Sequence, residues 1–360
     1  MNKIKLLSLT NVILEYRIPV YNQLAEYFDV TVAHFGVKVN ENKTKFKQII
    51  LTKKKKGPFI FFKEDIFKLA SEYEAVIALG EFRVLPFFAL GFKKREFSLT
   101  YWGIGVSASY DNKFDEDRRW DKIRFYLMNK ADSIVFYTSY PIKRYVQYGG
   151  IKREKLFVAN NTVDVVEKIE IPKEKKHFLF VGTLYKAKKI FDLLEAYNIA
   201  FTKNPSIKPL IIIGDGEEYD NICNWIAVKN LSNNIQLIGA IYDQNKLKNY
   251  YTDAIACISP GQAGLTLLNS MAYGVPFVTT SNAITGGEIF NIKNNVNGII
   301  YQGSIERLAE IIEELSKNKS KVLAMAENAQ NYYFTKRTMP IMVKGLVDAI
   351  NYAIKEHKKA

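Results

Sequence analysis

The sequence predicts an α/β protein of two domains, each built on a doubly wound parallel sheet. The chain has 360 residues, which exceeds the ~100–200 of a usual single domain. Short apolar runs that suit buried strands alternate with stretches of helical periodicity in both halves. Between the halves, residues 168–176 are polar, contain Pro172 and fit neither pattern, so we expect a linker there.

The first domain, residues 1–167, opens with a strand, a helix and a strand joined by short connections. We expect the two strands at 4–9 and 30–34, with a helix between them that ends near Phe28. This succession is typical of parallel sheets. Further strands are expected at 75–79, 96–101 and 133–136, and helices at 63–72, 83–90, 120–130 and 139–147.

The second domain, residues 177–336, repeats the alternation, and a helical segment, residues 337–360, follows it. Met342, Leu346 and Ile350 recur there at helical spacing. The expected strands of the domain lie at 177–181, 210–213, 235–238, 254–258, 275–279 and 298–301. Its helices are expected at 189–203, 217–229, from 243 onward, 264–273, 287–292 and 305–315.

The composition indicates a globular, cytoplasmic protein with a basic surface. Hydrophobic residues make up 48% and charged residues 24%, and no apolar run approaches the ~20 residues of a membrane-spanning helix. We expect no signal peptide, and we expect Cys223 and Cys257, which lie in apolar patterns, to be reduced core thiols. The net charge of +14 suits an anionic membrane surface, a phosphorylated substrate or nucleic acid.

The segment 259–280 carries the strongest functional pattern. It follows the expected strand 254–258, is interrupted at Pro260, and begins a helix near Gly264. A strand, a glycine-bearing turn and a helix direct unpaired backbone N–H groups and the positive end of the helix dipole at the space above the turn. The pattern therefore suits a phosphate or diphosphate, although an ordinary α/β turn with closely packed glycines has the same pattern.

Three shorter motifs follow other parts of the second domain. Gly182 and Lys188 belong to a glycine turn with lysines at a helix start, which suits a diphosphate or a merely solvated helix start. Gly214 opens a Gly-x-Gly turn that is a weak signal alone. Glu288 follows two glycines and either caps a helix or binds ribose hydroxyls.

Taken together, these motifs resemble a known family. Gly182 to Lys188, Gly214 to Gly216, Gly239, Gly261 to Gly274 and Glu288 to Gly298 follow the order and spacing of the retaining glycosyltransferases of the GT-B fold, family 4. The resemblance is strong over 177–335 and weaker over 1–165. It implies two Rossmann-like domains facing across a cleft, the second binding a nucleotide-sugar and the first receiving the acceptor. It also implies a C-terminal helix that crosses back to the first domain, and no metal or other cofactor.

The resemblance also implies roles for individual residues. Lys188 matches the diphosphate lysine, and Thr183 stands where many members have a partnering arginine. The family's two glutamates, separated by seven residues, are replaced here by Gly261 and Asn269, so neither carboxylate is present. The donor-binding set implied in this way is Gly182, Thr183, Lys188, Gly214, Gly239, Gly261, Gln262, Ala263, Gly264, Leu265, Thr266, Asn269 and Glu288.

In the first half, residues 101–105 resemble the acceptor-side glycine turn of the family. Many relatives have a histidine near the place of Ile104, so no general base is inherited there. Front-face transfer needs little enzyme base, because the departing phosphate can take the proton; positioning and stabilisation of the leaving diphosphate then carry the chemistry. The catalytic residue is left open, with Arg17, Trp102 and Asp111 as candidates.

Two charged segments have other interpretations. Residues 115–117, Asp-Glu-Asp, match the metal-binding Asp-x-Asp of another glycosyltransferase class but end no strand pattern, so we expect a solvated charge run and no metal. Lys53, Lys54, Lys55 and Lys56 precede the aromatic run 59–62. They suit peripheral contact with an anionic membrane, or a lysine loop before a buried strand or helix.

The sequence therefore predicts a glycosyltransferase that moves a sugar, with retention, from a nucleotide-diphosphate donor to a glycan or lipid-linked acceptor in bacterial surface polysaccharide synthesis. The expected location is the cytoplasm, with a peripheral position on the inner face of the cell membrane left open. Two alternatives also remain, a nucleotide-sugar epimerase of the same fold and a non-catalytic basic protein that binds membranes. Few base-stacking motifs are present, so a nucleic-acid partner is not expected.

Overall fold

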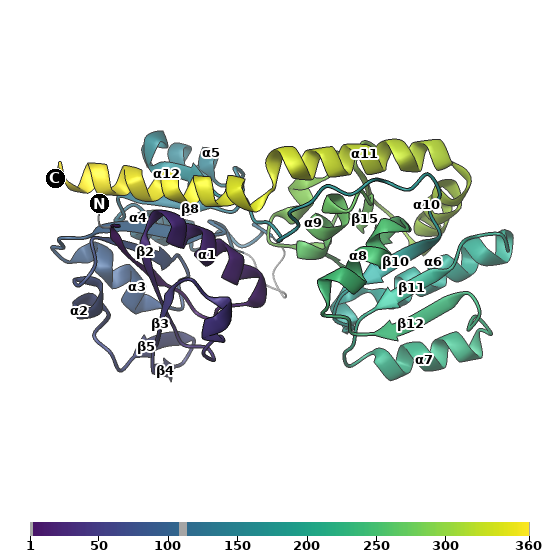
Figure 1. The fold of residues 1–360 in the computed structure, drawn as a ribbon, viewed down its shortest axis with the longest axis horizontal. Helices are drawn as coiled ribbons and strands as arrows, with labels where there is room; N and C mark the ends of the chain where they lie inside the picture. Colours follow the sequence, from purple (N-terminus) through teal and green to yellow (C-terminus); the bar gives the residue numbers. More distant parts are fainter. Residues whose placement is uncertain (1–2, 108–113, 360) are drawn as a thin grey trace. The chain divides into compact units, whose positions relative to one another are not determined.

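A computed structural model describes residues 3–107 and 114–359 of the chain. The chain forms two compact units, shown in Figure 1. The first unit comprises Met1–Asp164 and Met339–Ala360, and the second comprises Val165–Thr338. Both are α/β units built on parallel sheets, which confirms the predicted fold class.

The first unit contains a seven-stranded parallel sheet in the order β3-β2-β1-β6-β7-β8-β9. From β1 the chain adds strands on one side and then, from β6 onward, on the other, so the direction of winding changes between β1 and β6. Ligands of such sheets bind at the carboxyl ends of the strands beside this switch point. The strands are β1 Lys5–Leu9, β2 Asp29–His34, β3 Lys47–Ile50, β6 Ala75–Leu79, β7 Ser98–Gly103, β8 Ser133–Phe136 and β9 Leu156–Val158.

Helices cover both faces of this sheet. On one face, α1 (Ile18–Tyr27) and the C-terminal helix α12 (Met339–His357) share a buried core with β1, β2 and β6, and Figure 1 shows α12 in yellow along this unit. On the other face the core includes residues of the remaining helices, α2 Ile66–Ala70, α3 Leu85–Ala89, α4 Asp121–Met128 and α5 Ile142–Gln147. Short 3-10 segments are η1 Glu15–Arg17, η2 Glu41–Lys43, η3 Leu90–Phe92 and η4 Arg153–Lys155.

The lysine-rich segment forms a hairpin that the sequence patterns did not predict. Strand β4 (Lys53–Lys56) pairs antiparallel with β5 (Phe59–Phe62), and Gly57 allows the turn with a φ of +59°. Ile60 and Phe62 pack on the core, whereas all four lysines are exposed. The hairpin therefore adds to the sheet-and-helix core through one of its faces only.

The second unit contains a six-stranded parallel sheet in the order β12-β11-β10-β13-β15-β17, with its switch point between β10 and β13. Because crossovers are right-handed, α6 and α7 lie on one face of the sheet and α9, which follows the reversal, lies on the other. The strands are β10 His177–Val181, β11 Leu210–Ile213, β12 Ile235–Gly239, β13 Ala254–Ile258, β15 Phe277–Thr280 and β17 Gly298–Tyr301, with a small pair formed by β14 Gln262–Ala263 and β16 Ile284–Thr285.

The helices of this unit are α6 Ile190–Lys203, α7 Tyr219–Val228, α8 Gln244–Thr252, α9 Leu265–Ala272, α10 Ile305–Lys317 and α11 Lys319–Lys336, with 3-10 segments η5 Lys186–Lys188 and η6 Glu288–Asn291. The helix α11 was missed by the sequence patterns. It starts after Asn318, whose side chain caps it by accepting from the Lys321 N–H. Its buried residues, including Val322, Met325 and Tyr333, are separated by alanines and polar residues, so the apolar stripe is weak.

Two expectations differ from the structure. The expected linker 168–176 lies within the second unit, where Lys175 Nζ donates to the Thr252 carbonyl at 2.7 Å and the Ile169 carbonyl accepts from Gln330. Cys223 is exposed on α7 and is not a core thiol, whereas Cys257 is buried in β13. The apolar pattern around Cys223 comes from its buried helix neighbours Ile222 and Ile226, which face the core in its place.

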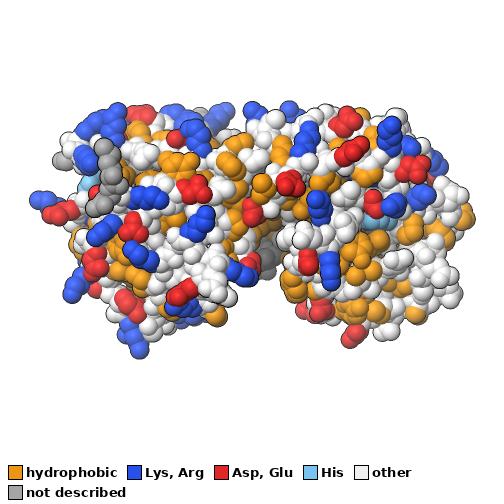
Figure 2. All heavy atoms as spheres, viewed as in Figure 1, with side chains coloured by type: hydrophobic (Ala, Val, Ile, Leu, Met, Phe, Trp, Pro, Cys, Tyr) orange, Lys and Arg blue, Asp and Glu red, His pale blue; other side chains and the backbone are white. Residues whose placement is uncertain are grey.

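In the described part of the chain, none of the helices combines the length and apolar character needed to cross a membrane. The visible face in Figure 2 carries Lys and Arg side chains that are spread among acidic and apolar ones on both units. The positive net charge is therefore distributed over that face and does not form one large basic patch on it.

Candidate functional site

The predicted donor residues come together at the switch point of the second unit. Gly182 follows the end of β10, and the turn that contains Gly261 follows the end of β13, the neighbouring strand. The hydroxyl of Thr266, on the first turn of α9, donates to the Val181 carbonyl at 3.3 Å and links the two segments. Topology thus brings residues about 80 positions apart to one edge of the sheet.

Lys188 is a buried cation at this edge. Its side chain is 9% exposed, and its Nζ lies 3.2 Å from the position that a Cβ on Gly182 would occupy. Within the residues that the structure describes, Nζ has no carboxylate and no hydrogen-bond acceptor as a partner. Burial therefore lowers the pKa of Lys188 to about 8. A buried charge without a counter-ion is costly, so the geometry provides for an anion from outside the chain.

The N-terminus of α9 lies in the same region. The helix begins at Leu265, after Gly264, and no side chain caps it. The first N–H groups of a helix have no intrahelical acceptor, and the helix dipole places positive charge there. A Cβ on Gly264 would meet nothing within 4 Å, so this helix end faces open space. Together with Lys188, it can bind a phosphate or diphosphate group.

Gly261 shows why the first family glutamate is absent. Its N–H donates to the Lys188 carbonyl at 3.1 Å, and a Cβ at this position would lie 2.1 Å from the Ala187 carbonyl oxygen. No side chain fits there with this backbone, because carbon and oxygen cannot approach so closely. The exchange of glutamate for glycine therefore lets the turn before Lys188 pack directly on the turn after β13.

The other residues of this stretch have distinct positions. Asn269 lies one helical turn after Leu265 and is half-buried, and no partner of its side-chain amide is recorded among the described residues. Gln262 accepts a hydrogen bond of 2.9 Å from the Tyr185 hydroxyl. Ala263 is buried in the small strand β14 and has no polar side chain. Of these three, Asn269 has the side chain best placed to contact a ligand.

The Glu288 carboxylate is held by hydrogen bonds within the chain. Its carboxylate accepts from the Gly286 N–H at 2.9 Å and from the Thr285 hydroxyl at 3.4 Å, and the side chain is buried at the start of η6. These contacts hold the loop before η6, and no side chain caps η6 itself. The role of Glu288 as a ribose ligand stays a prediction.

The glycines at the ends of β11 and β12 serve close packing. A Cβ on Gly214 would lie 1.9 Å from the Gly182 carbonyl oxygen, and the Gly214 N–H donates to the Gly239 carbonyl at 2.9 Å. Gly239 has a φ of +86°, which favours glycine. Thr183 is exposed beside these turns. Whether these residues contact a donor stays a prediction.

In the first unit, two of the three catalytic candidates come together. The Arg17 guanidinium lies 4.7 Å from the centre of the Trp102 ring and 4.9 Å from that of Tyr137. The third candidate, Asp111, lies outside the described residues. Glu81 and Arg83, on the loop after β6, form an ion pair with each other. Sequence reasoning missed Tyr137, although its position directly after β8 was a usable signal, since residues that follow parallel strands gather at one edge.

The charge run around Asp115 differs from its expected solvated state. Asp115 is buried, with a φ of +62°, and accepts hydrogen bonds from the Tyr140 hydroxyl at 2.9 Å and from Arg144. Arg144 also pairs with Asp121, which pairs in turn with Arg124. The arginines that neutralise Asp115 and Asp121 lie on helices α4 and α5, so a local pattern could not show the pairing. Among the described residues, no group of three or more His, Cys, Asp or Glu side chains is placed to hold a metal ion.

Comparisons with solved structures define the class of protein. A glycosyltransferase from Rickettsia africae covers 99% of this chain and 100% of its own length with a TM-score of 0.74 at 16% identity. HepE from Anabaena, solved in complex with UDP and glucose, covers 97% of this chain and 99% of its own with a TM-score of 0.69 at 16% identity. At these identities the likeness establishes the fold, which is that of the GT-B glycosyltransferases.

The sequence of the second unit matches a known family. Residues 164–332 match the family Glycosyl transferases group 1. The matched residues are slightly less than half of the chain and lie almost entirely in its second unit, which therefore contains a domain similar to that family. The poly(glycerol-phosphate) alpha-glucosyltransferase of Bacillus subtilis (strain 168) is 25% identical over 247 residues, which are 66% of this chain and 36% of that protein. The chain thus spans about a third of this relative's length. Membership of family 4 and retention stay predictions.

Proposed function

We propose that the chain transfers a sugar from a nucleoside-diphosphate donor to a glycan or lipid-linked acceptor, with retention, in bacterial surface polysaccharide synthesis. The observation that carries this proposal is the buried, unpaired ammonium of Lys188 beside the uncapped N-terminus of α9. A diphosphate supplies the negative charge that both groups lack. The family match over residues 164–332 supports glycosyl transfer as the reaction that uses such a group.

In the proposed reaction, the second unit stabilises the leaving group. The bond between the sugar and the diphosphate breaks as the acceptor oxygen attacks, and negative charge grows on the departing diphosphate. Lys188 and the first N–H groups of α9 are fixed donors for that charge, and such fixed donors favour the transition state without reorganisation. The departing phosphate takes the proton of the acceptor hydroxyl. The proposal requires no metal ion and no carboxylate at positions 261 and 269.

The names of the relatives support the donor and acceptor classes. HepE was solved with UDP and glucose, so a uridine nucleotide is the first donor to try. The Bacillus subtilis relative is named for glucosyl transfer to poly(glycerol-phosphate), a phosphodiester polymer. For this chain we infer a nucleotide-sugar donor and a surface polymer or its lipid-linked precursor as acceptor.

A donor panel tests the reaction. The purified chain is incubated with UDP-, GDP- and ADP-sugars, with and without a membrane extract as acceptor, and nucleotide release is followed by mass spectrometry. We expect release from one donor class that rises when acceptor is added. Product NMR with donor alone separates the epimerase alternative, because an epimerase changes the sugar without an acceptor. Turnover of none of these donors under either condition would refute the proposal.

We also propose that the hairpin of β4 and β5 contacts an anionic membrane surface from the cytoplasmic side. Directly opposed residues of antiparallel strands share a face, so Lys54 and Lys56 lie on one face with Phe61 and Phe59. The opposite face packs Ile60 and Phe62 on the core. Basic side chains attract anionic headgroups, and aromatic ones suit the interface.

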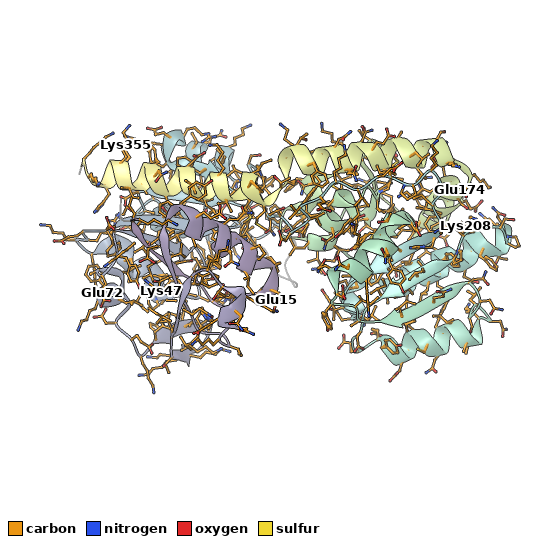
Figure 3. The ribbon with its side chains drawn as sticks, viewed as in Figure 1. Glu15, Lys47, Glu72, Glu174, Lys208 and Lys355 are labelled. Atoms are coloured by element: carbon orange, nitrogen blue, oxygen red, sulfur yellow. The ribbon has the colours of Figure 1, made fainter. Side chains whose placement is uncertain are left out.

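Liposome sedimentation tests this contact. We expect the chain to bind vesicles with anionic lipid and not neutral ones, and the binding to weaken with salt. The double variant Lys54→Gln/Lys56→Gln is expected to lose most of this binding. The matched control is Lys344→Gln/Lys355→Gln, which removes the same charge from exposed positions on α12, where Figure 3 labels Lys355. Equal losses in the two double variants would mean that net charge, and not the hairpin, drives binding.

A further inference from the structure

A second cation without a counter-ion lies in the first unit. Arg17 ends η1 and is the residue before α1, a helix of ten residues, and it follows β1 at the switch point of that sheet. The side chain is 9% exposed, and its Nη1 atom is buried without a hydrogen-bond partner. A buried charged donor without an acceptor carries a free-energy penalty, which an anion that reaches it would remove.

The surroundings of Arg17 hold the guanidinium but do not neutralise it. The rings of Tyr16, Trp102 and Tyr137 lie 5.1, 4.7 and 4.9 Å from it. Among the described residues, no carboxylate forms an ion pair with Arg17. Glu15, two positions earlier and labelled in Figure 3, is largely exposed and pairs instead with Lys43 at 3.5 Å. Aromatic contacts and a side-chain hydrogen bond with Tyr16 orient the guanidinium, while its buried Nη1 still lacks an acceptor.

Trp102 supplies a second unpaired donor at the same place. It lies at the carboxyl end of β7, and its Nε1–H is buried without an acceptor. The site therefore combines an unpaired arginine N–H and an unpaired indole N–H. The start of α1 adds no free donor of this kind, because the Ile18 N–H donates to the Glu15 carbonyl and Pro19 has no N–H. Both unpaired groups are donors, and the ligand that matches them is an anion with several acceptor oxygens.

We propose that Arg17 and Trp102 bind a phosphate group carried by the acceptor. This inference rests on the proposed function, because it takes the first unit as the acceptor side. It narrows the acceptor to a phosphorylated one, such as a phosphodiester polymer or a lipid-linked phosphate. Arginine suits phosphate because its N–H groups form paired hydrogen bonds to two oxygens. The phosphate is not that of the donor, whose cradle is formed by Lys188 and α9.

NMR of the full chain tests the site directly. The chain contains three tryptophans, and the indole Nε1–H signal of Trp102 is assigned by its loss in Trp102→Phe. The probes are glycerol 3-phosphate as a monoester, dimethyl phosphate as a diester, inorganic phosphate, and glycerol as the uncharged control. We expect the phosphate probes, and not glycerol, to shift the Trp102 signal. The monoester and diester arms separate a lipid-linked terminal phosphate from a phosphodiester polymer.

Substitutions distinguish binding of an acceptor phosphate by Arg17 from binding of the donor. Arg17→Met is expected to weaken binding of the phosphate probes by ~10–100-fold, the effect of one charged hydrogen bond, and to leave UDP affinity unchanged. Arg17→Lys retains part of the affinity, and the control Arg307→Met, at an exposed position, retains all of it. If Arg17→Met does not fold, the Trp102→Phe variant decides by its loss of probe affinity.

Two outcomes would overturn the proposal. One is a Trp102 signal that no phosphate probe moves. The other is an Arg17→Met variant that loses UDP affinity and keeps probe affinity, which would assign the guanidinium to the donor. Failure of the proposed function itself has a different signature, since none of UDP, GDP and ADP then binds to the wild-type chain.

Discussion

Lys188 is a buried cation and Arg144 is a cation whose side chain is 16% exposed, but among the described residues only Arg144 has a carboxylate counter-ion. Arg144 pairs with Asp115 and Asp121, whose side chains are 2% and 12% exposed. Lys188 has no such partner in the described part of the chain, and burial lowers its pKa to about 8. The comparison separates a charge that is part of the fold from one that is available to a ligand. Removing one partner of a neutralised pair would leave an uncompensated charge, whereas we infer that the unneutralised Lys188 serves the ligand of the proposed function.

The largest expected effect comes from breaking the neutralised network. Arg144→Met removes one partner and leaves Asp115 and Asp121 buried with less compensation, so we expect the free energy of unfolding to fall by about 3–5 kcal/mol. Chemical denaturation measures this. The control Arg307→Met breaks an exposed pair with Glu310 and should cost less than ~1 kcal/mol. Similar losses in the two variants would contradict a special role for the buried network.

Replacing Lys188 should have the opposite effect on the free energy of unfolding. Lys188→Met removes a buried charge without a partner, and we expect the ligand-free chain to become more stable at pH 7 by roughly 1–3 kcal/mol. The sign follows from the lowered pKa, because the folded state disfavours the charged form. Thermal and chemical unfolding check it, with Lys186→Met, at an exposed position of the same turn, as the control. A destabilised Lys188→Met variant would mean that the ammonium has a structural partner after all.

Gly261 tests the close packing of the two turns at the second unit's switch point. In Gly261→Ala the new Cβ would meet the Ala187 carbonyl oxygen at 2.1 Å, so the turns must separate. We expect a loss of about 1–3 kcal/mol of stability, as for other overpacked sites, together with weaker UDP binding. The matched control is Gly264→Ala, whose Cβ would meet nothing within 4 Å. Its stability should match that of the wild type, and a larger loss there would refute this account of the two glycines.

The smallest expected effect is a pH dependence of UDP affinity. Because burial lowers the pKa of Lys188 to about 8, the ammonium loses its proton as pH rises through this value. UDP affinity should fall above pH 8, by up to about tenfold per unit. Calorimetric titrations at several pH values measure it. The Lys188→Met variant should lack this decline, and its persistence there would assign the titration to another group.

Part of the fold and of the candidate site could be predicted from the sequence, because the patterns that indicate them are local. Gly182 and Gly264 follow strands directly, Lys188 lies in the turn after β10, and the alternation of strands and helices predicted both sheets. The segment 168–176, predicted as a linker, lies within the second unit. The hairpin and α11 were not predicted, since strand β4 consists of four lysines and α11 has a weak apolar stripe. The pairing of Asp115 with Arg144 joins residues 29 positions apart, and the neighbourhood of Arg17 and Trp102 depends on strand order. Such contacts have no local pattern.

One titration tests the central claim that Lys188 is kept unneutralised for a nucleotide diphosphate. The full chain is titrated with UDP by calorimetry at pH 7, beside Lys188→Met and the control Lys186→Met. We predict that UDP binds the wild type and the control equally and binds Lys188→Met ~10–100-fold more weakly, the effect of a lost charged hydrogen bond. Equal affinity for all three proteins would contradict the account, because the buried ammonium would then have no part in holding the diphosphate.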